Sequence, residues 1–190
     1  MLVRVCRMVG YLGGSAPLSA LVAAPPHSLE RQSWQARELV SATVNADGWG
    51  AAAWMHGDPA PCVYVSTAPI WADVNAGHLG RALRSHCLLA AVRSATDPRN
   101  VGPANTQPFA SGSVAFLHNG WIDAFAERIR RRLLGALSDE RFAAIRGATD
   151  SEHLFALILE ELDRSGGPGD ARRLLAAANA ACLRVAGWAR

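Results

Sequence analysis

The sequence contains no lysine, so all 19 of its basic residues are arginine. This bias is typical of translation from a GC-rich genome, and we expect a bacterial protein. Together with 16 acidic residues the arginines leave a net charge of +3, too weak a basic balance to indicate a nucleic-acid partner. Of the 190 residues, 50% are apolar and only 18% are charged. This composition and length suit one folded domain and exclude a disordered tail.

Cysteine is sparse as well. The four cysteines are Cys6, Cys62, Cys87 and Cys182. None of them stands in a C-x-x-C pair, so the ligand spacing of zinc and iron–sulfur sites is missing and we expect no metal. Four cysteines in a chain of this length are ordinary for a reduced cytoplasmic protein.

Long hydrophobic runs are also missing. No apolar stretch reaches the roughly 18 residues of a membrane span, so we expect no membrane partner. The N-terminal residues 1–24 are basic and then moderately apolar, which faintly resembles a secretory signal. Gly13, Gly14 and Pro17 interrupt that stretch, so we favour a cytoplasmic protein, with secretion as the alternative.

Short apolar runs separated by turn residues fill the first half of the chain. Residues 87–92 (CLLAAV) and 114–118 (VAFLH) are flanked by turn residues, which predicts two buried strands. Residues 51–54 and 62–65 are expected to pair as a hairpin around a Gly-Asp turn.

The second half is predicted to be helical. Residues 125–137 form one amphipathic segment. Thr149 is the expected N-cap of a helix in which Glu152 completes a capping box, and a Gly-Gly-Pro sequence ends that helix. A last helix is expected at residues 170–181, followed by a candidate strand at 181–188. Strands first and helices later predict an α+β fold.

Cys6 is the first candidate for chemistry, because it lies near the N-terminus, before an apolar run at 9–12 that predicts a first strand. An α-amino group has a pKa of about 7.7–8.0, so much of it is a free base at neutral pH. It can take the proton of a thiol when a cysteine begins the chain. Position alone favours the alternative, a small buried cysteine that only packs.

Other polar residues lie at the ends of predicted elements, and each has an ordinary structural explanation as well. Asn119 and Gly120 suit a tight turn, or an oxyanion hole formed by an amide and a backbone N–H. Arg93 suits a bidentate bond to a ligand carboxylate, or a surface salt bridge. Asp150 is explained by the dipole of the helix that it begins, and Gly48 by a glycine-rich turn before a strand.

The order of the motifs resembles the glutaminase domain of the class II glutamine amidotransferases, which are N-terminal nucleophile hydrolases. The motifs are CRMVGYLG, NADGWG, AVRSAT, NTQPF, FLHNG and ATDSE, and the resemblance extends from Cys6 to about residue 162. NADGWG together with residues 66–73 and 84–96 is most similar to the γ-glutamyl amidohydrolases of ergothioneine biosynthesis. Those enzymes release glutamate from γ-glutamyl-hercynylcysteine sulfoxide.

The resemblance implies catalytic roles at matching positions. Cys6 would be the thiol nucleophile, with its own amine as the base. Asn119 and the N–H of Gly120 would hold the tetrahedral oxyanion. The reaction would pass through a γ-glutamyl thioester that water hydrolyses, without a metal or an organic cofactor.

The resemblance also implies a set of substrate-binding residues. Arg93 would bind the α-carboxylate of a γ-glutamyl group and Asp150 its α-ammonium. The backbone near Gly48 and Trp49 and the hydroxyl of Thr96 would border the same pocket.

The fold implied by the resemblance is a four-layer αββα sandwich. In this family the nucleophile begins the mature chain, whereas residues 1–5 precede Cys6 here. We expect either a misassigned start, with Val5 encoded by a GTG initiator codon, or a short propeptide, and an amidotransferase domain at 6–190. Because relatives usually continue beyond the capping-box helix, we also expect a truncated or divergent C-terminus.

Two other functions stay open at this point. One is a glutaminase that supplies ammonia to a separate synthase, and the other is a non-catalytic relative that binds γ-glutamyl ligands or a partner protein. The second applies if Cys6 stays blocked by the residues before it. In the leading hypothesis the partner is a small γ-glutamyl molecule, and the sequence leaves open whether the protein forms a homo-oligomer.

Overall fold

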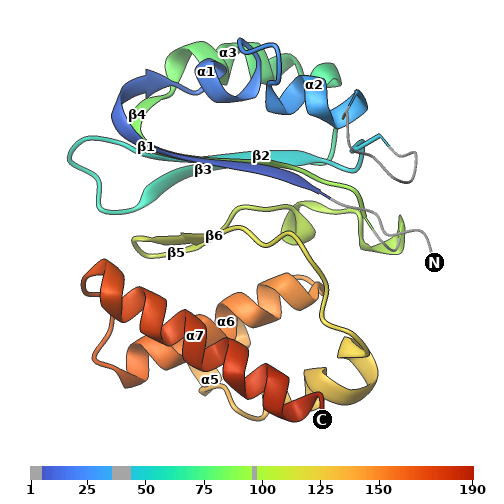
Figure 1. The fold of residues 1–190 in the computed structure, drawn as a ribbon, viewed down its shortest axis with the longest axis vertical. Helices are drawn as coiled ribbons and strands as arrows, with labels where there is room; N and C mark the ends of the chain where they lie inside the picture. Colours follow the sequence, from blue (N-terminus) through green and yellow to red (C-terminus); the bar gives the residue numbers. More distant parts are fainter. Residues whose placement is uncertain (1–5, 36–43, 96–97) are drawn as a thin grey trace. The chain divides into compact units, whose positions relative to one another are not determined.

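The computed structural model describes residues 6–35, 44–95 and 98–190 of the chain. They belong to two compact units, Met1–Gly120 and Trp121–Arg190 (Figure 1). The strands that the structure describes all lie in the first unit, and the described elements of the second unit are helices. This mixed chain confirms the broad α+β prediction.

A four-stranded antiparallel sheet forms the centre of the first unit, in the order β1-β4-β2-β3. Its strands are β1 (Arg7–Pro17), β2 (Trp49–Trp54), β3 (Pro61–Ser66) and β4 (Arg84–Val92). The predicted strands at 9–12 and 87–92 are therefore confirmed as parts of β1 and β4. The predicted hairpin is confirmed as β2 and β3, and Gly57 in its turn has a φ of 83°, which glycine adopts readily.

Three helices cover one face of this sheet (Figure 1). They are α1 (Ser19–Val22), α2 (Leu29–Trp34) and α3 (Val74–Ala82). The core on this face includes the fully buried side chains of Trp49, Leu88 and Val92. The indole N–H of Trp49 donates to the Asp73 carboxylate at 2.9 Å, and the same carboxylate caps α3 by accepting from the backbone of Asn75. The only polar atom of this buried aromatic side chain is thereby satisfied.

The opposite face of the sheet meets the segment that leads into a second hairpin, β5 (Phe109–Ser111) and β6 (Val114–Phe116). Side chains alternate between the two faces of a strand, so a side chain at position 50 would point away from the helices. A Cβ added to Gly50 would lie 2.3 Å from the carbonyl oxygen of Gln107. The chain at Gln107 therefore packs directly on the backbone of β2, and only a glycine permits that approach.

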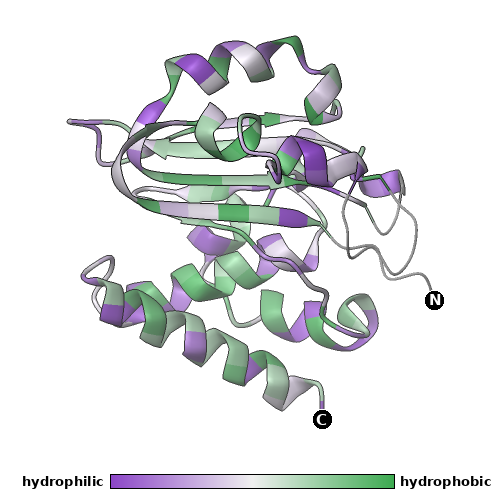
Figure 2. Cartoon of the chain, turned by 45° about the horizontal axis from the view of Figure 1, so that its top comes forward, coloured by the Kyte–Doolittle hydropathy of each residue, from purple (hydrophilic) through white to green (hydrophobic). Residues whose placement is uncertain are grey.

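Packing of two long helices, α6 (Asp150–Arg164) and α7 (Ala171–Trp188), organises the second unit. Figure 2 shows hydrophobic residues along both helices. The predicted N-cap of α6 is confirmed, since the Thr149 hydroxyl accepts from the N–H of Glu152 at 3.2 Å. The Glu152 carboxylate reaches back farther than a capping box requires, and accepts from the N–H groups of Arg146 and Gly147 at 2.8 and 2.7 Å.

The strand predicted at residues 181–188 is wrong, because these residues form the end of α7. Ala177 and Ala181 lie four residues apart on one helix face and are 4% and 0% exposed, so small side chains continue the helical packing. None of the helices that the structure describes is long and apolar enough to cross a membrane.

The amphipathic segment predicted at residues 125–137 is helical as far as Leu134 and ends three residues earlier than expected. The chain forms a π-helix, η4 (Phe125–Ile129), followed by the short helix α4 (Arg130–Leu134). Ala124, just before η4, has a φ of 48°, which lies in the left-handed region. Another short helix, α5 (Asp139–Ala144), then packs on α6.

Candidate active site

The pairing of β1 with β4 brings Cys6 and Arg93 together. Arg7 pairs with Val92 in the antiparallel ladder, so the residue before one strand falls opposite the residue after the other. Two residues from distant parts of the sequence therefore meet at the end of the sheet.

The sulfur of Cys6 lies beside both backbone groups of Ser94. The N–H of Ser94 donates to Sγ at 3.5 Å, and Sγ lies 3.8 Å from the Ser94 carbonyl oxygen. Burial raises the pKa of the Cys6 thiol above its ordinary value, although the Ser94 N–H and the positive charge of Arg93 act in the opposite direction. The thiol is thus protonated at neutral pH, and it needs a base to become a nucleophile.

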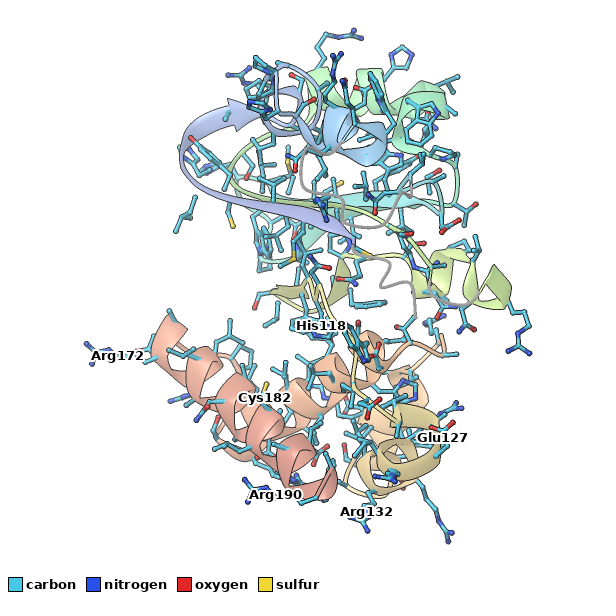
Figure 3. The ribbon with its side chains drawn as sticks, turned by 45° about the vertical axis from the view of Figure 1, so that its right-hand side comes forward. His118, Glu127, Arg132, Arg172, Cys182 and Arg190 are labelled. Carbon is cyan, nitrogen blue, oxygen red and sulfur yellow. The ribbon has the colours of Figure 1, made fainter. Side chains whose placement is uncertain are left out.

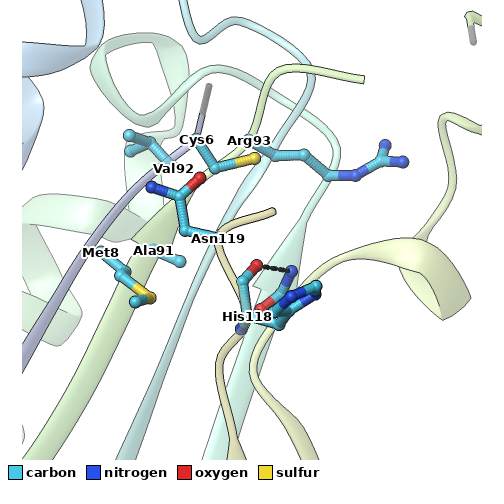
Figure 4. Close-up of a pocket in the computed structure, with 8 residues that line it drawn as sticks. Cys6, Met8, Ala91, Val92, Arg93, His118 and Asn119 are labelled. Atoms are coloured by element: carbon cyan, nitrogen blue, oxygen red, sulfur yellow. Dashed lines mark hydrogen bonds between the residues drawn. The ribbon is translucent and has the colours of Figure 1, made fainter. Parts of the chain in front are cut away.

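Arg93 carries an unsatisfied donor in this region. Its Nη1 is buried and has no hydrogen-bond partner, and burial lowers the pKa of the guanidinium. A buried guanidinium nitrogen without an acceptor is costly, so an anionic ligand bound there would be stabilised. In Figure 4 the Arg93 side chain extends away from the Cys6 sulfur, which separates the guanidinium from the thiol.

The NADGWG segment fixes the backbone of Arg93 and its neighbours. The N–H of Arg93 donates to the Gly48 carbonyl at 2.8 Å, and the N–H of Asp47 donates to the Arg93 carbonyl at 3.1 Å. The Asp47 carboxylate accepts from the N–H of Ala95 at 2.7 Å. Gly48 therefore contacts the site through its backbone, whereas the side chain of Trp49 is buried in the helix-covered core.

Asn119 directly follows a residue whose backbone is bound by the Gln107 side chain. The Gln107 Nε2 donates to the His118 carbonyl at 2.9 Å, and the His118 N–H donates to the Gln107 Oε1 at 2.6 Å. The His118 ring stacks on Phe116 with 6.1 Å between ring centroids. A Cβ added to Gly120 would lie 3.0 Å from His118 Nε2, so the imidazole packs against the Asn-Gly turn.

These residues line one pocket that is open to solvent. Its lining consists of Cys6, Met8, Ala91, Val92, Arg93, Gln107, His118 and Asn119. Figure 4 shows the Asn119 carboxamide turned toward the Cys6 side of the pocket. The pocket therefore brings together three of the residues predicted for the site. Cys6 supplies a thiol, Arg93 a cation and Asn119 an amide.

The other predicted site residues lie elsewhere in the described structure or outside it. Thr96 lies outside the described residues. Gly120 is exposed immediately after the pocket residue Asn119. Asp150 begins α6 in the second unit, where its carboxylate accepts from the N–H groups of Ile122 at 2.6 Å and Ser151 at 2.8 Å. Its predicted role toward an ammonium group stays a prediction.

The remaining cysteines are not part of this pocket. All four cysteines are free thiols; Cys62 and Cys182 are exposed, and Figure 3 shows Cys182 on α7. Cys87 is half-buried on β4, and burial raises the pKa of its thiol. Among the residues that the structure describes, no three His, Cys, Asp or Glu side chains come together as metal ligands.

Sequence reasoning missed three residues of this site. Ser94 contacts the Cys6 sulfur through its backbone, Asp47 binds the N–H of Ala95, and Gln107 binds the backbone of His118. Gln107 stands in the NTQPF motif, and its place in that motif was the only sequence signal that pointed to it. Ser94 makes its contact through the backbone N–H, which nearly every residue type has, so the sequence cannot indicate such a contact.

A family model described as glutamine amidotransferases class-II matches residues 19–186. The chain belongs to the class II glutamine amidotransferase family. The γ-glutamyl-hercynylcysteine sulfoxide hydrolase of Mycobacterium tuberculosis is 40% identical to this amidotransferase-family chain over 119 residues, which cover 63% of this chain and 50% of the relative. The enzyme of that name from Mycolicibacterium smegmatis is 33% identical over 192 aligned positions, covering 97% of this chain and 79% of the relative.

A solved structure from the same family is also similar. It is described as a glutamine aminotransferase class-II domain protein from Silicibacter pomeroyi, and matches with a TM-score of 0.59 and 25% identity. The match covers 90% of this chain and 60% of that chain. The chain thus spans half the length of the M. tuberculosis relative and three fifths of this structural relative.

Proposed function

We propose that this class II amidotransferase-family protein is an amidohydrolase that cleaves γ-glutamyl amides, with γ-glutamyl-hercynylcysteine sulfoxide as its substrate. The observation that carries the proposal is the pocket lined by Cys6, Arg93 and Asn119, together with the buried Nη1 of Arg93 that has no hydrogen-bond partner. The names of the mycobacterial relatives supply the substrate. In this proposal the protein acts in ergothioneine biosynthesis.

The proposed reaction requires a free α-amine on Cys6, either because translation starts at position 5 and the initiator methionine is removed, or because residues 1–5 are a propeptide that is cleaved. That amine takes the thiol proton, and the thiolate attacks the γ-carbonyl carbon of the substrate. The Asn119 amide and the Gly120 N–H stabilise the oxyanion. The tetrahedral intermediate collapses to a γ-glutamyl thioester as the ammonium of Cys6 protonates the leaving amine, and water then releases glutamate and the free thiol.

Binding of the γ-glutamyl group uses its two fixed charges. Arg93 donates to the α-carboxylate, which supplies the missing acceptor of its buried nitrogen. The Asp150 carboxylate accepts the N–H groups of Ile122 and Ser151 and, at 3.3 Å, the Ser151 hydroxyl. Because a carboxylate has about four acceptor positions, it keeps about one of them for the α-ammonium. Thr96 and the backbone at Gly48 and Trp49 border the pocket in this proposal, and the chain has the four-layer αββα sandwich of its family.

The test compares a chain expressed as Met-Cys6 and onward, from which methionine is removed, with the chain that keeps residues 1–5. We expect glutamate release from γ-glutamyl-hercynylcysteine sulfoxide only when Cys6 is the first residue. Mass spectrometry of the N-terminal peptide establishes which residue comes first in each chain. Cys6→Ala should abolish this release, whereas Cys87→Ala, outside the pocket on β4, should retain it. Ammonia release from glutamine in preference would instead support a glutaminase with a partner synthase. If the chain that begins at Cys6 shows neither activity, the result would support the remaining alternative, a non-catalytic binding protein.

A further inference from the structure

The side chain of Gln107 binds the backbone of His118 as a neighbouring strand would. Its Nε2 donates to the His118 carbonyl at 2.9 Å and its Oε1 accepts from the His118 N–H at 2.6 Å. One carboxamide thus satisfies the donor and the acceptor of a single residue beyond the end of β6. Because both hydrogen bonds act on the same residue, they fix the direction in which the chain leaves β6.

The backbone of Gln107 packs closely against β2 at Gly50. A Cβ on Gly50 would come within 2.3 Å of the Gln107 carbonyl oxygen and 2.8 Å of the Tyr64 carbonyl oxygen. At Gly48, which has a φ of 120°, a Cβ would lie 2.6 Å from the Ser66 carbonyl oxygen and 3.3 Å from Thr106 Oγ1. The two glycines of the DGWG sequence therefore form a flat surface on which residues 106 and 107 lie.

The preceding residue is fixed as well. The Thr106 hydroxyl donates to the Gly102 carbonyl at 2.9 Å, and Thr106 is 2% exposed. A continuous set of contacts consequently leads from Gly48 and Gly50 through residues 106 and 107 to His118. Asn119 is the next residue, and its carboxamide lines the pocket that contains Cys6.

We propose that Gln107 is a positioning residue, which clamps the backbone of His118 and thereby holds the amide of Asn119 in the place where the oxyanion forms. This proposal rests on the proposed amidohydrolase function. Gln107 acts through Asn119 and makes no bond to the substrate. The glycines of NADGWG take part indirectly, because they let the backbone of Gln107 approach β2.

The first test uses Gln107→Glu, which keeps the shape of the side chain. A carboxylate still accepts from the His118 N–H but places an oxygen against the His118 carbonyl, whereas the protonated acid donates to that carbonyl again. We expect kcat at pH 8 to fall by up to about 10²-fold with little change in KM, as for a displaced catalytic group. The ratio of variant to unaltered kcat should rise as the pH is lowered. Gln32→Glu is the matched control, since Gln32 binds the His27 carbonyl on the surface, and its kcat should be unchanged.

A double-mutant cycle tests whether Gln107 acts through Asn119. Asn119→Ala alone should lower kcat by about 10²- to 10³-fold, as loss of an oxyanion donor does. Gln107→Ala should then cost much less in the Asn119→Ala background than in the unaltered protein. Equal costs in both backgrounds, or a loss confined to KM, would overturn the proposal, because Gln107 would then act independently of Asn119 or on the substrate.

Hydrogen exchange of the His118 amide separates this proposal from the function on which it rests. The amide should exchange slowly in the unaltered protein and faster in Gln107→Ala, with the amides of β4 unchanged. Unchanged exchange at His118 would refute the clamp even in an active enzyme. If the chain that begins at Cys6 hydrolyses no γ-glutamyl compound, the proposed function fails, and the exchange rate still decides whether the clamp exists.

Discussion

The backbone N–H of Ser94 donates to the sulfur of Cys6 across the end of the pair β1 and β4. This contact places the thiol in a half-buried position against the chain that carries Arg93, where a thiolate would receive a hydrogen bond and lie near a positive charge. Burial outweighs both, so the pKa of the thiol is raised. The sulfur is therefore prepared for a nucleophilic role but not activated by its described neighbours alone.

The reactivity of Cys6 should depend on the residues before it. In the chain that keeps residues 1–5, alkylation by iodoacetamide at pH 7 should be slower at Cys6 than at the exposed Cys62 and Cys182, because only the thiolate reacts. The rate at Cys6 should increase when Cys6 begins the chain. Peptide mass spectrometry over time measures each site separately, and equal rates at Cys6 in both chains would argue against the amine as its base.

Arg93→Lys should impair substrate binding without unfolding the protein. A lysine keeps the charge but loses the planar pair of donors, so kcat/KM should fall about 10- to 100-fold, the cost of a charged hydrogen bond. The free energy of unfolding should change little, because Nη1 of Arg93 has no hydrogen bond to lose and the lysine keeps the charge. Steady-state kinetics and urea unfolding measure the two effects. A marked loss of stability would show that Arg93 mainly supports the fold.

Two glycines should respond in opposite ways to substitution by alanine. Gly50→Ala should destabilise the protein by about 1–3 kcal/mol, because its Cβ would contact backbone oxygens that cannot move aside easily. Gly77→Ala in α3 should stabilise it by about 0.5–1 kcal/mol, since a Cβ there meets no atom within 4 Å and alanine favours a helix. Urea unfolding of both variants checks the contrast. A stable Gly50→Ala protein would show that residue 107 can be displaced.

His153 should make the stability of the protein sensitive to acid. Burial lowers the pKa of its imidazole, and Nδ1 is 2.7 Å from the Thr149 carbonyl oxygen while Nε2 is buried without a partner. Below about pH 6.5 the unfolded chain binds a proton that the folded chain excludes, so stability falls as the pH falls, by up to about 1.4 kcal/mol per unit. Above that pH the effect is absent.

The variant His153→Gln tests this dependence. Its free energy of unfolding should change less between pH 7 and pH 5 than that of the unaltered protein, because the titrating group is gone. The exposed His56→Gln should follow the unaltered protein and serves as the control. Parallel curves for all three proteins would exclude His153 as the source of acid sensitivity.

The sequence by itself determined the family, the strands β1 to β4 and the N-cap of α6. Ordered motifs, short apolar runs between turns, and Thr149 before a helical pattern are local signals, and each depends on a few neighbouring residues. Tertiary structure alone decided that residues 181–188 continue α7, because packing of this helix, with Ala181 fully buried, outweighs a pattern that also suits a strand. It also decided the strand register that sets Cys6 opposite Arg93. Burial of the Arg93 Nη1 without a hydrogen-bond partner, and the hydrogen bonds between Gln107 and His118, are likewise visible only in the folded chain. These features arise from contacts between distant segments, which residue order specifies only through the folded chain.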